Sequence, residues 1–471
     1  MKASLKQAKE MLESNKDLST EFKALFAMIL SMMELLLTLA KLPKNSQNSS
    51  IPPSADPNRP KVSKSESDKK RGGQKGRKFS TLEPVSDPDQ IISVPIDRST
   101  LPPGHTYTEA GFSSRQVVEI DLLKMIIEYR YEILQDENGK RYTAPCPEGF
   151  SRPIQYGNSV KTGSVYMSLF QMIPYNRIED YFVHKAGIPI SAGSLYNFNE
   201  EAFNRLEKFE RIAKQKLISS PLIHADETGI NVGGKRIWLH TASGPLWTLF
   251  QPHAKRGTEA MEHMNILPHF KGILVHDHWS SYFTYKNASH SLCNAHHLRE
   301  LQAMIEAHPS NSWAKDMKKF LEDLNTKTRD NKGVLDPKPQ TLWREHYRKI
   351  LAKGDLECPL PPPPPPDSPK KRGKPAKTKE RNLLERLRDF EDETLRFMTL
   401  DYVPFTNNQG ENDIRMTKVQ QKISGCFRSF KGAEIFCRVR SYLLTCQKHQ
   451  LCPTDALNIL FSGKLPAFCD D

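Results

Sequence analysis

The middle of the chain carries short apolar runs and helix-spaced apolar positions in an order typical of a mixed α/β domain. Three apolar segments separated by tight turns, at residues 222–232, 235–244 and 245–252, predict a meander of three antiparallel strands. A helix, a fourth apolar strand, a short helix or turn, and a fifth strand that leads into a helix follow, over residues 257–267, 272–279, 280–287 and 290–308. The predicted order is therefore β-β-β-α-β-α-β-α.

This order is that of the ribonuclease-H-like fold, an α/β class built on a mixed sheet. In that fold the first and fourth strands are neighbours at the centre of the sheet, which would place Asp226 beside Asp277. Two carboxylates so close repel each other unless divalent cations lie between them. The end of an apolar strand is also a costly place for a charge, so this pair predicts a functional site.

A third carboxylate is expected on a helix that starts near Asn408. Glu411, Arg415 and Lys418 have the spacing i, i+4 and i+7, which places them on one helix face. Alone, this pattern is typical of a solvated, salt-bridged face. Together with the two aspartates, it completes a candidate site for two metal ions.

Helical spacing also precedes the strands, over residues 160–208. A helix over 176–185, a turn at Gly187 and a second helix capped by Ser191 or Ser194 resemble a helix-turn-helix. In that interpretation the second helix reads DNA bases through its polar side chains, which are Ser194, Tyr196, Asn197 and Asn199. An ordinary pair of helices that supports the next domain is the alternative.

The first 45 residues contain a nearly continuous apolar stretch, Ala24–Ala40, interrupted by one charge at Glu34. Its length is at the lower limit for a bilayer span, and the acidic residues upstream are wrong for a signal peptide. We therefore expect an oligomerisation or docking helix here, not a membrane span.

The chain is basic, with 68 Lys and Arg against 55 Asp and Glu and a formal net charge of +13, which favours nucleic acid as a partner. Residues 43–83 are too polar to bury a core, and from Arg59 to Lys78 they hold nine basic and two acidic residues. We interpret this linker as a tether that also neutralises DNA phosphates. The residues expected to make those contacts are Lys69, Lys70 and Arg71. A polyproline spacer with a second basic cluster follows Cys358.

Residues 84–155 predict a small mixed domain. Residues 116–127 have the apolar density of a strand, and the Asn-Gly turn within 137–141 is typical of a hairpin. Eight cysteines without a CxxC pair supply neither a disulfide framework nor the commonest zinc-ribbon signature, which indicates a reducing compartment.

Four segments resemble the DDE transposases of the IS66 family (the TnpC class). They are HADET at 224–228, VHDHWSSY at 275–282, CNAHHLREL at 293–301 and NNQGENDIRMTKVQQKISGCFRS at 407–429. The polar linker is similar to that family's Asn/Ser/Pro-rich linker, and residues 114–130 are similar to its zinc-binding domain. The family's CxxC pairs are missing from the latter, where Cys146 is the nearest cysteine, so the resemblance disfavours zinc as a cofactor here.

The resemblance implies a ribonuclease-H-like catalytic domain with a helical insertion and an Asp-Asp-Glu triad that binds Mg²⁺, or Mn²⁺ as a substitute. By position the triad is Asp226, Asp277 and Glu411. It implies cleavage of double-stranded DNA at the terminal repeats of an insertion sequence, followed by strand transfer into target DNA. The basic residues expected to contact DNA phosphates after the glutamate are Arg415, Lys418 and Lys422.

The same resemblance implies a homo-oligomer on DNA in the bacterial cytoplasm, at the nucleoid, with small accessory proteins of the same element as candidate partners. The expected domains are the apolar helix (1–45), basic linker (46–83), small domain (84–155), helix-turn-helix-like segment (156–212), first part of the catalytic core (213–300), helical insertion with its Pro-rich linker (301–400), final core helices (401–450) and C-terminal tail (451–471).

Three other interpretations stay open. The histidines near the aspartates, together with Cys293, suggest a zinc hydrolase; they are His224, His276, His278, His296 and His297. However, His276 and His278 should face away from Asp277, because adjacent residues of a strand point to opposite faces. A structure-specific nuclease of the same fold and a non-catalytic DNA-binding relic are the other two. Metal preference, strand-transfer products and the presence of any activity separate the three.

Overall fold

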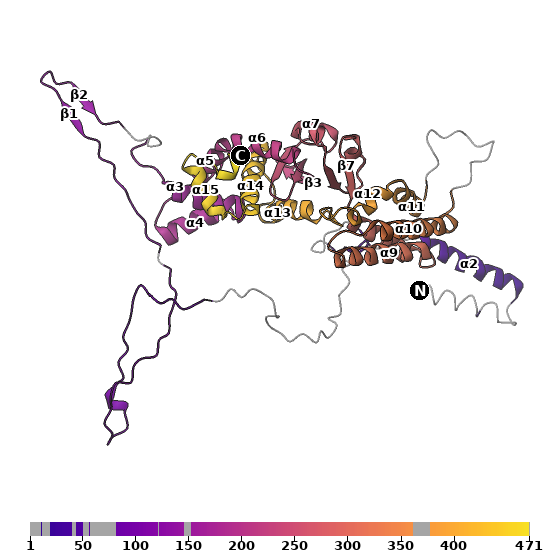
Figure 1. Ribbon diagram of the computed structural model, residues 1–471, viewed down its shortest axis with the longest axis horizontal. Coiled ribbons are helices and arrows are strands. Elements are labelled where there is room, and N and C mark those ends of the chain that lie inside the picture. Colours follow the sequence, from indigo (N-terminus) through magenta and orange to yellow (C-terminus); the bar gives the residue numbers. More distant parts are fainter. Residues whose placement is uncertain are drawn as a thin grey trace. The chain divides into compact units, whose positions relative to one another are not determined.

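The computed structural model describes residues 11, 19–39, 44–49, 56, 82–120, 122–145, 152–360 and 377–470 (Figure 1). The phosphate contacts expected of Lys69, Lys70 and Arg71, the thiol of Cys146 and the polyproline run lie outside these residues. The chain divides into two units. The first comprises Met1–Pro60, Gly149–Asp180 and Ile190–Asp471, and the second comprises Lys61–Glu148 and Tyr181–Pro189.

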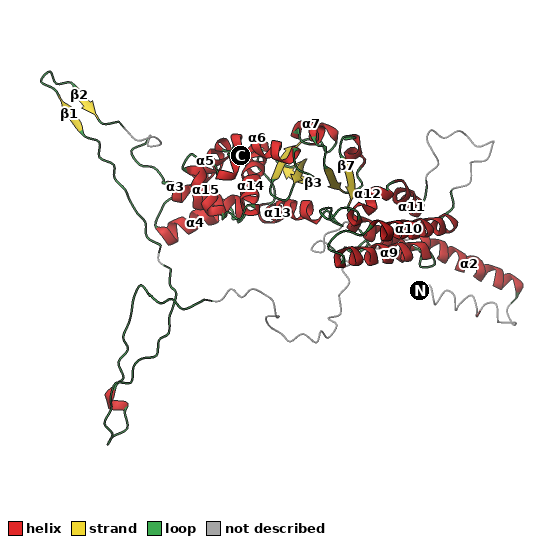
Figure 2. Ribbon diagram, in the orientation of Figure 1, coloured by secondary structure: helices red, strands yellow, loops and turns green. Residues whose placement is uncertain are grey.

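A five-stranded mixed sheet lies at the centre of the first unit (Figure 2). Its strands are β3 (Leu222–Val232), β4 (Lys235–Ser243), β5 (Thr248–His253), β6 (Ile273–His276) and β7 (Ser289–Leu292). Their spatial order is β5-β4-β3-β6-β7, with β3, β4 and β5 antiparallel and with β6 parallel to both β3 and β7. This confirms the predicted meander and the adjacency of the first and fourth strands, and it is compatible with a ribonuclease-H-like domain.

Local sequence explains both the buried parallel strand β6 and the tight turn that joins β3 to β4. All four residues of β6 are buried, as expected for a short parallel strand covered on both faces. The tight turn between β3 and β4 is formed by Gly233 and Gly234, whose φ angles of 56° and 83° suit glycine and match a two-residue hairpin.

Helices flank the sheet and continue from its strands. They are α7 (Thr258–Met264), the 3₁₀ turn η5 (Ser280–Thr284), α8 (Asn294–Ala307), α13 (Asn408–Ser424) and α14 (Phe430–Lys448). Helix α13 packs on β3 and β4, and α14 packs on β5. The element predicted as a short helix or turn is η5, and the helix predicted to start near residue 408 is α13.

The segment before the sheet is helical, as predicted. It consists of α3 (Asn158–Val165), the π-helical turn η3 (Tyr166–Phe170), α4 (Tyr175–Ala186), α5 (Ala192–Arg205) and α6 (Glu207–Ile218), with α15 (Pro453–Phe461) packing on α3. Gly187 has a φ of 60°, and the Ser191 hydroxyl accepts a hydrogen bond from the backbone N–H of Ser194 at 3.2 Å. The predicted glycine turn and the Ser191 cap are therefore confirmed.

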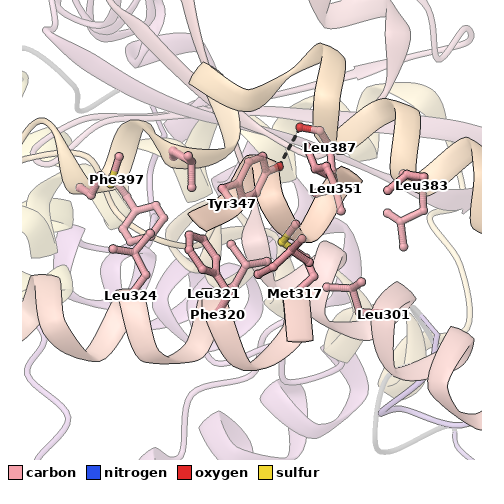
Figure 3. Close-up of a cluster of buried hydrophobic side chains, with 14 of the residues drawn as sticks. Leu301, Met317, Phe320, Leu321, Leu324, Tyr347, Leu351, Leu383, Leu387 and Phe397 are labelled. Atoms are coloured by element: carbon pink, nitrogen blue, oxygen red, sulfur yellow. Dashed lines mark hydrogen bonds between the residues drawn. The ribbon is translucent and has the colours of Figure 1, made fainter. Parts of the chain in front are cut away.

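The helices of residues 312–398 share a hydrophobic core (Figure 3). They are α9 (Ser312–Asp330), α10 (Pro337–Glu357), α11 (Lys379–Asp389), α12 (Glu391–Leu395) and the 3₁₀ turn η6 (Arg396–Met398). Trp313, Phe320 and Leu324 are buried at helical spacing on α9, and the Tyr347 hydroxyl of α10 donates to the Leu387 carbonyl at 2.7 Å. Helix α12 packs on the edge strand β7, which attaches this helical insertion to the sheet.

The second unit has little regular structure. A short hairpin of β1 (Ile133–Gln135) and β2 (Arg141–Thr143) closes around Gly139, whose φ of 83° agrees with the predicted Asn-Gly turn. A 3₁₀ turn, η2, covers Arg98–Thr100. The strand predicted over 116–127 is wrong for residues 116–120 and 122–127, which are exposed and carry no regular element. Apolar density cannot form a strand without a neighbouring strand to accept its backbone hydrogen bonds.

The N-terminal apolar stretch forms α2 (Thr20–Leu39), in the first unit. Large apolar side chains on it are exposed, among them Phe22, Leu25 and Met28, whereas Leu30 is buried. No helix in the described part of the chain is both long and apolar enough to cross a membrane.

Candidate active site

The two aspartates lie on neighbouring strands: Asp226 is within β3, which continues to Val232 and does not end at the aspartate, and Asp277 directly follows β6. In the parallel pair β3–β6, His224 lies opposite Val275, and Asp226 and Asp277 each follow two residues later. Residues in register on neighbouring parallel strands point to the same face of the sheet. The two carboxylates therefore lie on the same face, just past the last paired residues of β3 and β6. The Asp226 carboxylate accepts from the backbone N–H of Glu227, and that of Asp277 accepts from the N–H of Trp279, both at 2.9 Å.

Negative charge accumulates around Asp226. Burial raises the pKa of this carboxyl well above its usual range, and the charges of Glu227, Asp277 and Glu411 raise it further, against the single backbone hydrogen bond from Glu227. The carboxylates predicted from the sequence therefore act on one another. Burial among other acids therefore favours a cation bound beside Asp226.

Glu411 reaches the site from the first turn of α13. Its carboxylate lies 3.9 Å from the Cys293 thiol, 3.9 Å from Arg299 Nη2 and 4.0 Å from His296 Nδ1. Arg299 and His296 are both on α8, which begins directly after Cys293. The third predicted carboxylate thus lies between the end of β7 and two side chains of the following helix.

Asn407 fixes the start of α13 against β3. Its side-chain amide donates to the Ala225 carbonyl at 2.9 Å, and its Oδ1 lies 2.7 Å from His224 Nδ1. Its backbone N–H points at Cys293 Sγ, 3.1 Å away. A Cβ on Gly410 would meet the Asn407 amide at 3.2 Å and His224 Cβ, on β3, at 3.4 Å, so the close approach of this helix turn to the strand favours glycine.

Three side chains in the described part of the chain could together hold a metal ion with their ligand atoms within 4.8 Å of one another: Cys293, His296 and Glu411. Burial raises the pKa of Cys293 to about 11, so the sulfur keeps its proton at neutral pH, and burial lowers the pKa of His296. The oxygen donors of Asp226, Asp277 and Glu411 suit a hard divalent cation better than this protonated thiol does.

Glu227, the residue after Asp226 on β3, has its own set of buried partners. Its side chain is only 2% exposed and accepts from Arg256 through Nε at 2.9 Å and Nη2 at 2.6 Å. The Tyr282 hydroxyl donates to its other oxygen at 2.5 Å. Burial raises the pKa of Glu227, and the hydrogen bonds from Tyr282 and Arg256 oppose that rise. Sequence reasoning missed both contacts: Arg256 belongs to none of the recognised segments, and Tyr282 ends the VHDHWSSY segment without any local signal of its bond to Glu227.

A pocket of about 270 Å³ opens beside Asp277. Its polar lining includes Arg256, His296, Glu300 and Arg386. Arg386 comes from α11 of the insertion and bonds Glu300 of α8. The helical insertion therefore supplies a cation to the same pocket, and no local signal in the sequence indicates this.

The histidines around Asp277 are packed into the core. His276 is fully buried, with its Nε2 3.0 Å from His290 Nδ1 and its ring against Tyr282, and His278 packs on Phe390. Burial lowers the pKa of His276 to about 3 and that of His278 to about 4, so both are neutral. Neither belongs to the group of potential metal ligands found among the described residues, although His278 lines the same pocket as Asp277.

The basic residues of α13 lie towards solvent. Arg415, Lys418 and Lys422 are exposed, and Lys418 Nζ also donates to the Gly229 carbonyl at 2.5 Å. Two residues before Arg415, Asp413 forms an ion pair with Lys448 at 3.0 Å and accepts from the Ser243 hydroxyl at 2.6 Å. Asp413 is thereby occupied as a structural group on the other face of the helix.

The predicted base-reading residues of α5 have unequal exposure. Asn197 is exposed, and Ser194 and Tyr196 are half-buried. The prediction for Asn199 is wrong: this side chain is 1% exposed, accepts from the Ser168 hydroxyl at 3.0 Å and donates to Tyr175 at 2.8 Å. A buried amide with both its ends bonded holds helices together and is not accessible to a DNA base.

The chain matches one model of a known protein family. A family model described as Transposase IS66 family matches residues 153–435, which contain the whole five-stranded sheet, the described helices of the insertion and α13. No curated protein matches the chain.

Proposed function

Because the chain belongs to the Transposase IS66 family, whose model covers more than half of its 471 residues, we propose that it is a DDE-type DNA transposase. Its substrates would be the terminal repeats of its own element and a target duplex. The observation that carries this proposal is the position of Asp226 and Asp277 on neighbouring strands, with Glu411 in the first turn of the helix that packs on β3.

We assign Asp226, Asp277 and Glu411 as the residues that would hold Mg²⁺, or Mn²⁺ in its place. Their oxygen donors and the uncompensated charge at Asp226 fit such ions. When bound, a pair of these ions would supply Lewis-acid activation of the attacking oxygen and stabilisation of the leaving oxygen in phosphodiester chemistry.

The chain's own residues would orient these groups. Asn407 holds the first turn of α13, and hence Glu411, against the strand that carries Asp226. Arg415, Lys418 and Lys422 are exposed on the same helix and would bind DNA phosphates without reading sequence. Ser194, Tyr196 and Asn197 on α5 are the candidates for base reading. Assembly as a homo-oligomer on DNA, with accessory proteins of the element, completes the proposal.

The test is incubation of the purified protein with a duplex that carries the end of its element, in Mg²⁺ or Mn²⁺. We expect nicked and joined products on a sequencing gel. Nicked products without joined ones would favour a structure-specific nuclease instead. Activity restricted to Zn²⁺ would favour a zinc hydrolase, and no product with any of these ions would leave a DNA-binding relic.

A further inference from the structure

Arg256 is held from three sides at the edge of the candidate site. It lies in the loop between β5 and α7, and Glu227 accepts from its Nε and Nη2. The guanidinium carbon lies 4.8 Å from the ring centroid of Trp238 and 4.3 Å from that of Trp279. Two indole faces and a carboxylate therefore fix the plane of this side chain.

These contacts leave part of the Arg256 guanidinium available to bind a ligand. It is 41% exposed, it lines the pocket beside Asp277, and its Nη1 has no hydrogen-bond partner among the described residues. An ion pair that served only to neutralise buried Glu227 would not need an open donor edge facing the pocket. Because its rotamer is already fixed, binding a ligand through that edge costs little further side-chain entropy.

We propose that Arg256 binds a phosphate of the DNA strand that enters this pocket, through Nη1 and the exposed edge of its guanidinium. A phosphodiester approaching Asp226 and Asp277 meets like charge, so a cation fixed next to them would orient it. Glu227, Trp238 and Trp279 act as positioning residues for Arg256. This inference rests on the proposed function, because it requires DNA at the carboxylates.

The test replaces single phosphates of the end duplex by uncharged methylphosphonates, one position at a time. With the unmodified protein, we expect one position near the cut to lose about tenfold to a hundredfold in cleavage rate. In Arg256→Gln, the same replacement should cause no further loss, whereas all other positions should respond as in the unmodified protein. Arg256→Lys keeps the positive charge but lacks the planar set of guanidinium donors, so its cleavage rate should lie between those of Arg256→Gln and the unmodified protein.

Two further variants keep the result interpretable. Arg211→Gln removes an exposed arginine on α6 and should leave the whole methylphosphonate profile unchanged. Arg256→Gln alone leaves Glu227 buried and unpaired, so the double variant Glu227→Gln/Arg256→Gln, which removes both charges, serves if the single variant unfolds.

The outcomes separate this inference from the proposed function. If every methylphosphonate, at every position, slows Arg256→Gln by the same factor as it slows the unmodified protein, Arg256 contacts no single phosphate. That result would overturn the proposed contact and leave Arg256 and Glu227 as a structural ion pair. The same series is also measured as binding affinity in Ca²⁺, which needs no cleavage. Position-specific coupling in binding, with no cutting in Mg²⁺ or Mn²⁺, would overturn the transposase proposal and retain the contact.

Discussion

Acidic residues of similar type have opposite roles in this domain because their surroundings differ. Asp413 is matched by Lys448 and two hydroxyl donors, whereas Asp226 is buried among other acids with one backbone donor. The first arrangement stabilises a charge in place, and the second destabilises it until a cation is bound. Substitutions that remove only the charge distinguish the two.

The three carboxylates should be required for chemistry and dispensable for DNA binding. Asp226→Asn, Asp277→Asn and Glu411→Gln are nearly isosteric, so each should lower cleavage and strand transfer together by about a hundredfold or more. Gel-shift affinity for the end duplex should stay within about twofold, since phosphate contacts come from Lys and Arg. Retained strand transfer in Glu411→Gln alone would place the third ligand elsewhere, with Glu434 next to test.

The control for these variants must come from the surface. Glu227 adjoins Asp226 but holds Arg256 and Tyr282, so Glu227→Gln is expected to impair the site and cannot serve as a neutral comparison. Glu259 on α7 is exposed, and Glu259→Gln should keep full activity.

Charge removal should shift thermal stability in opposite directions at Asp226 and Asp413. The raised pKa of Asp226 means that its ionised form is disfavoured in the folded state, so Asp226→Asn should raise the melting temperature in EDTA at neutral pH by a few degrees. This gain should vanish below about pH 4, where the carboxyl is protonated in both the folded and unfolded states. Asp413→Asn should instead destabilise by about 2–3 kcal/mol, because the largely buried Lys448 ammonium loses its carboxylate and keeps only neutral hydrogen-bond acceptors. Calorimetry that gives the same sign for both would contradict this account.

At the scale of elements, the site depends on how α13 meets the sheet. Asn407→Ala removes two buried hydrogen bonds, one to His224 and one to the Ala225 carbonyl. We expect a loss of about 1–3 kcal/mol in unfolding free energy, together with slower cleavage as Glu411 loses its position. Denaturant titration and cleavage rates measure the two effects. The neighbouring Asn408 is exposed, and Asn408→Ala should change neither.

Of two apolar regions that the sequence predicts as strands, only one forms a strand, and the difference shows what a strand needs besides its own sequence. Residues 273–276 and 116–127 are both apolar, but only the former lie between two strands, β3 and β7. The first four residues of β3 are buried beside β6. Residues 273–276 form a strand because they are buried and their backbone groups pair with two neighbours. The described residues of 116–127 have neither burial nor a neighbouring strand.

At the scale of the whole molecule, residues 1–83 precede all the candidate catalytic residues, and we expect their deletion to leave the catalytic domain folded. The Asn48 side-chain amide donates a hydrogen bond to the Glu306 carboxylate at 2.6 Å, on the partly buried surface of α8 and not within the sheet. Circular dichroism and thermal melting should show the sheet and insertion retained. Loss of the cooperative transition would mean that this region is part of the core.

The same deletion should weaken DNA binding in a way that salt reveals. The linker holds nine basic and two acidic residues from Arg59 to Lys78, so its removal should make the dependence of affinity on salt less steep. The oligomeric state, measured by light scattering, should fall if α2 is the oligomerisation helix. An unchanged salt slope would assign the phosphate contacts to the folded domains alone.

Periodicity and turn chemistry were sufficient to predict the strands of the sheet, the Ser191 cap, the Asn-Gly hairpin and the helix from Asn408, because these depend on neighbours in the chain. Strand order also brought Asp226 next to Asp277, since the fold class with this order pairs the first and fourth strands. Packing alone decided that Glu227 holds Arg256, that Arg386 of the insertion reaches the pocket of Asp277, and that Asn199 is buried. Those contacts join residues far apart in sequence, and local propensity carries no information about which distant side chain fills a buried space.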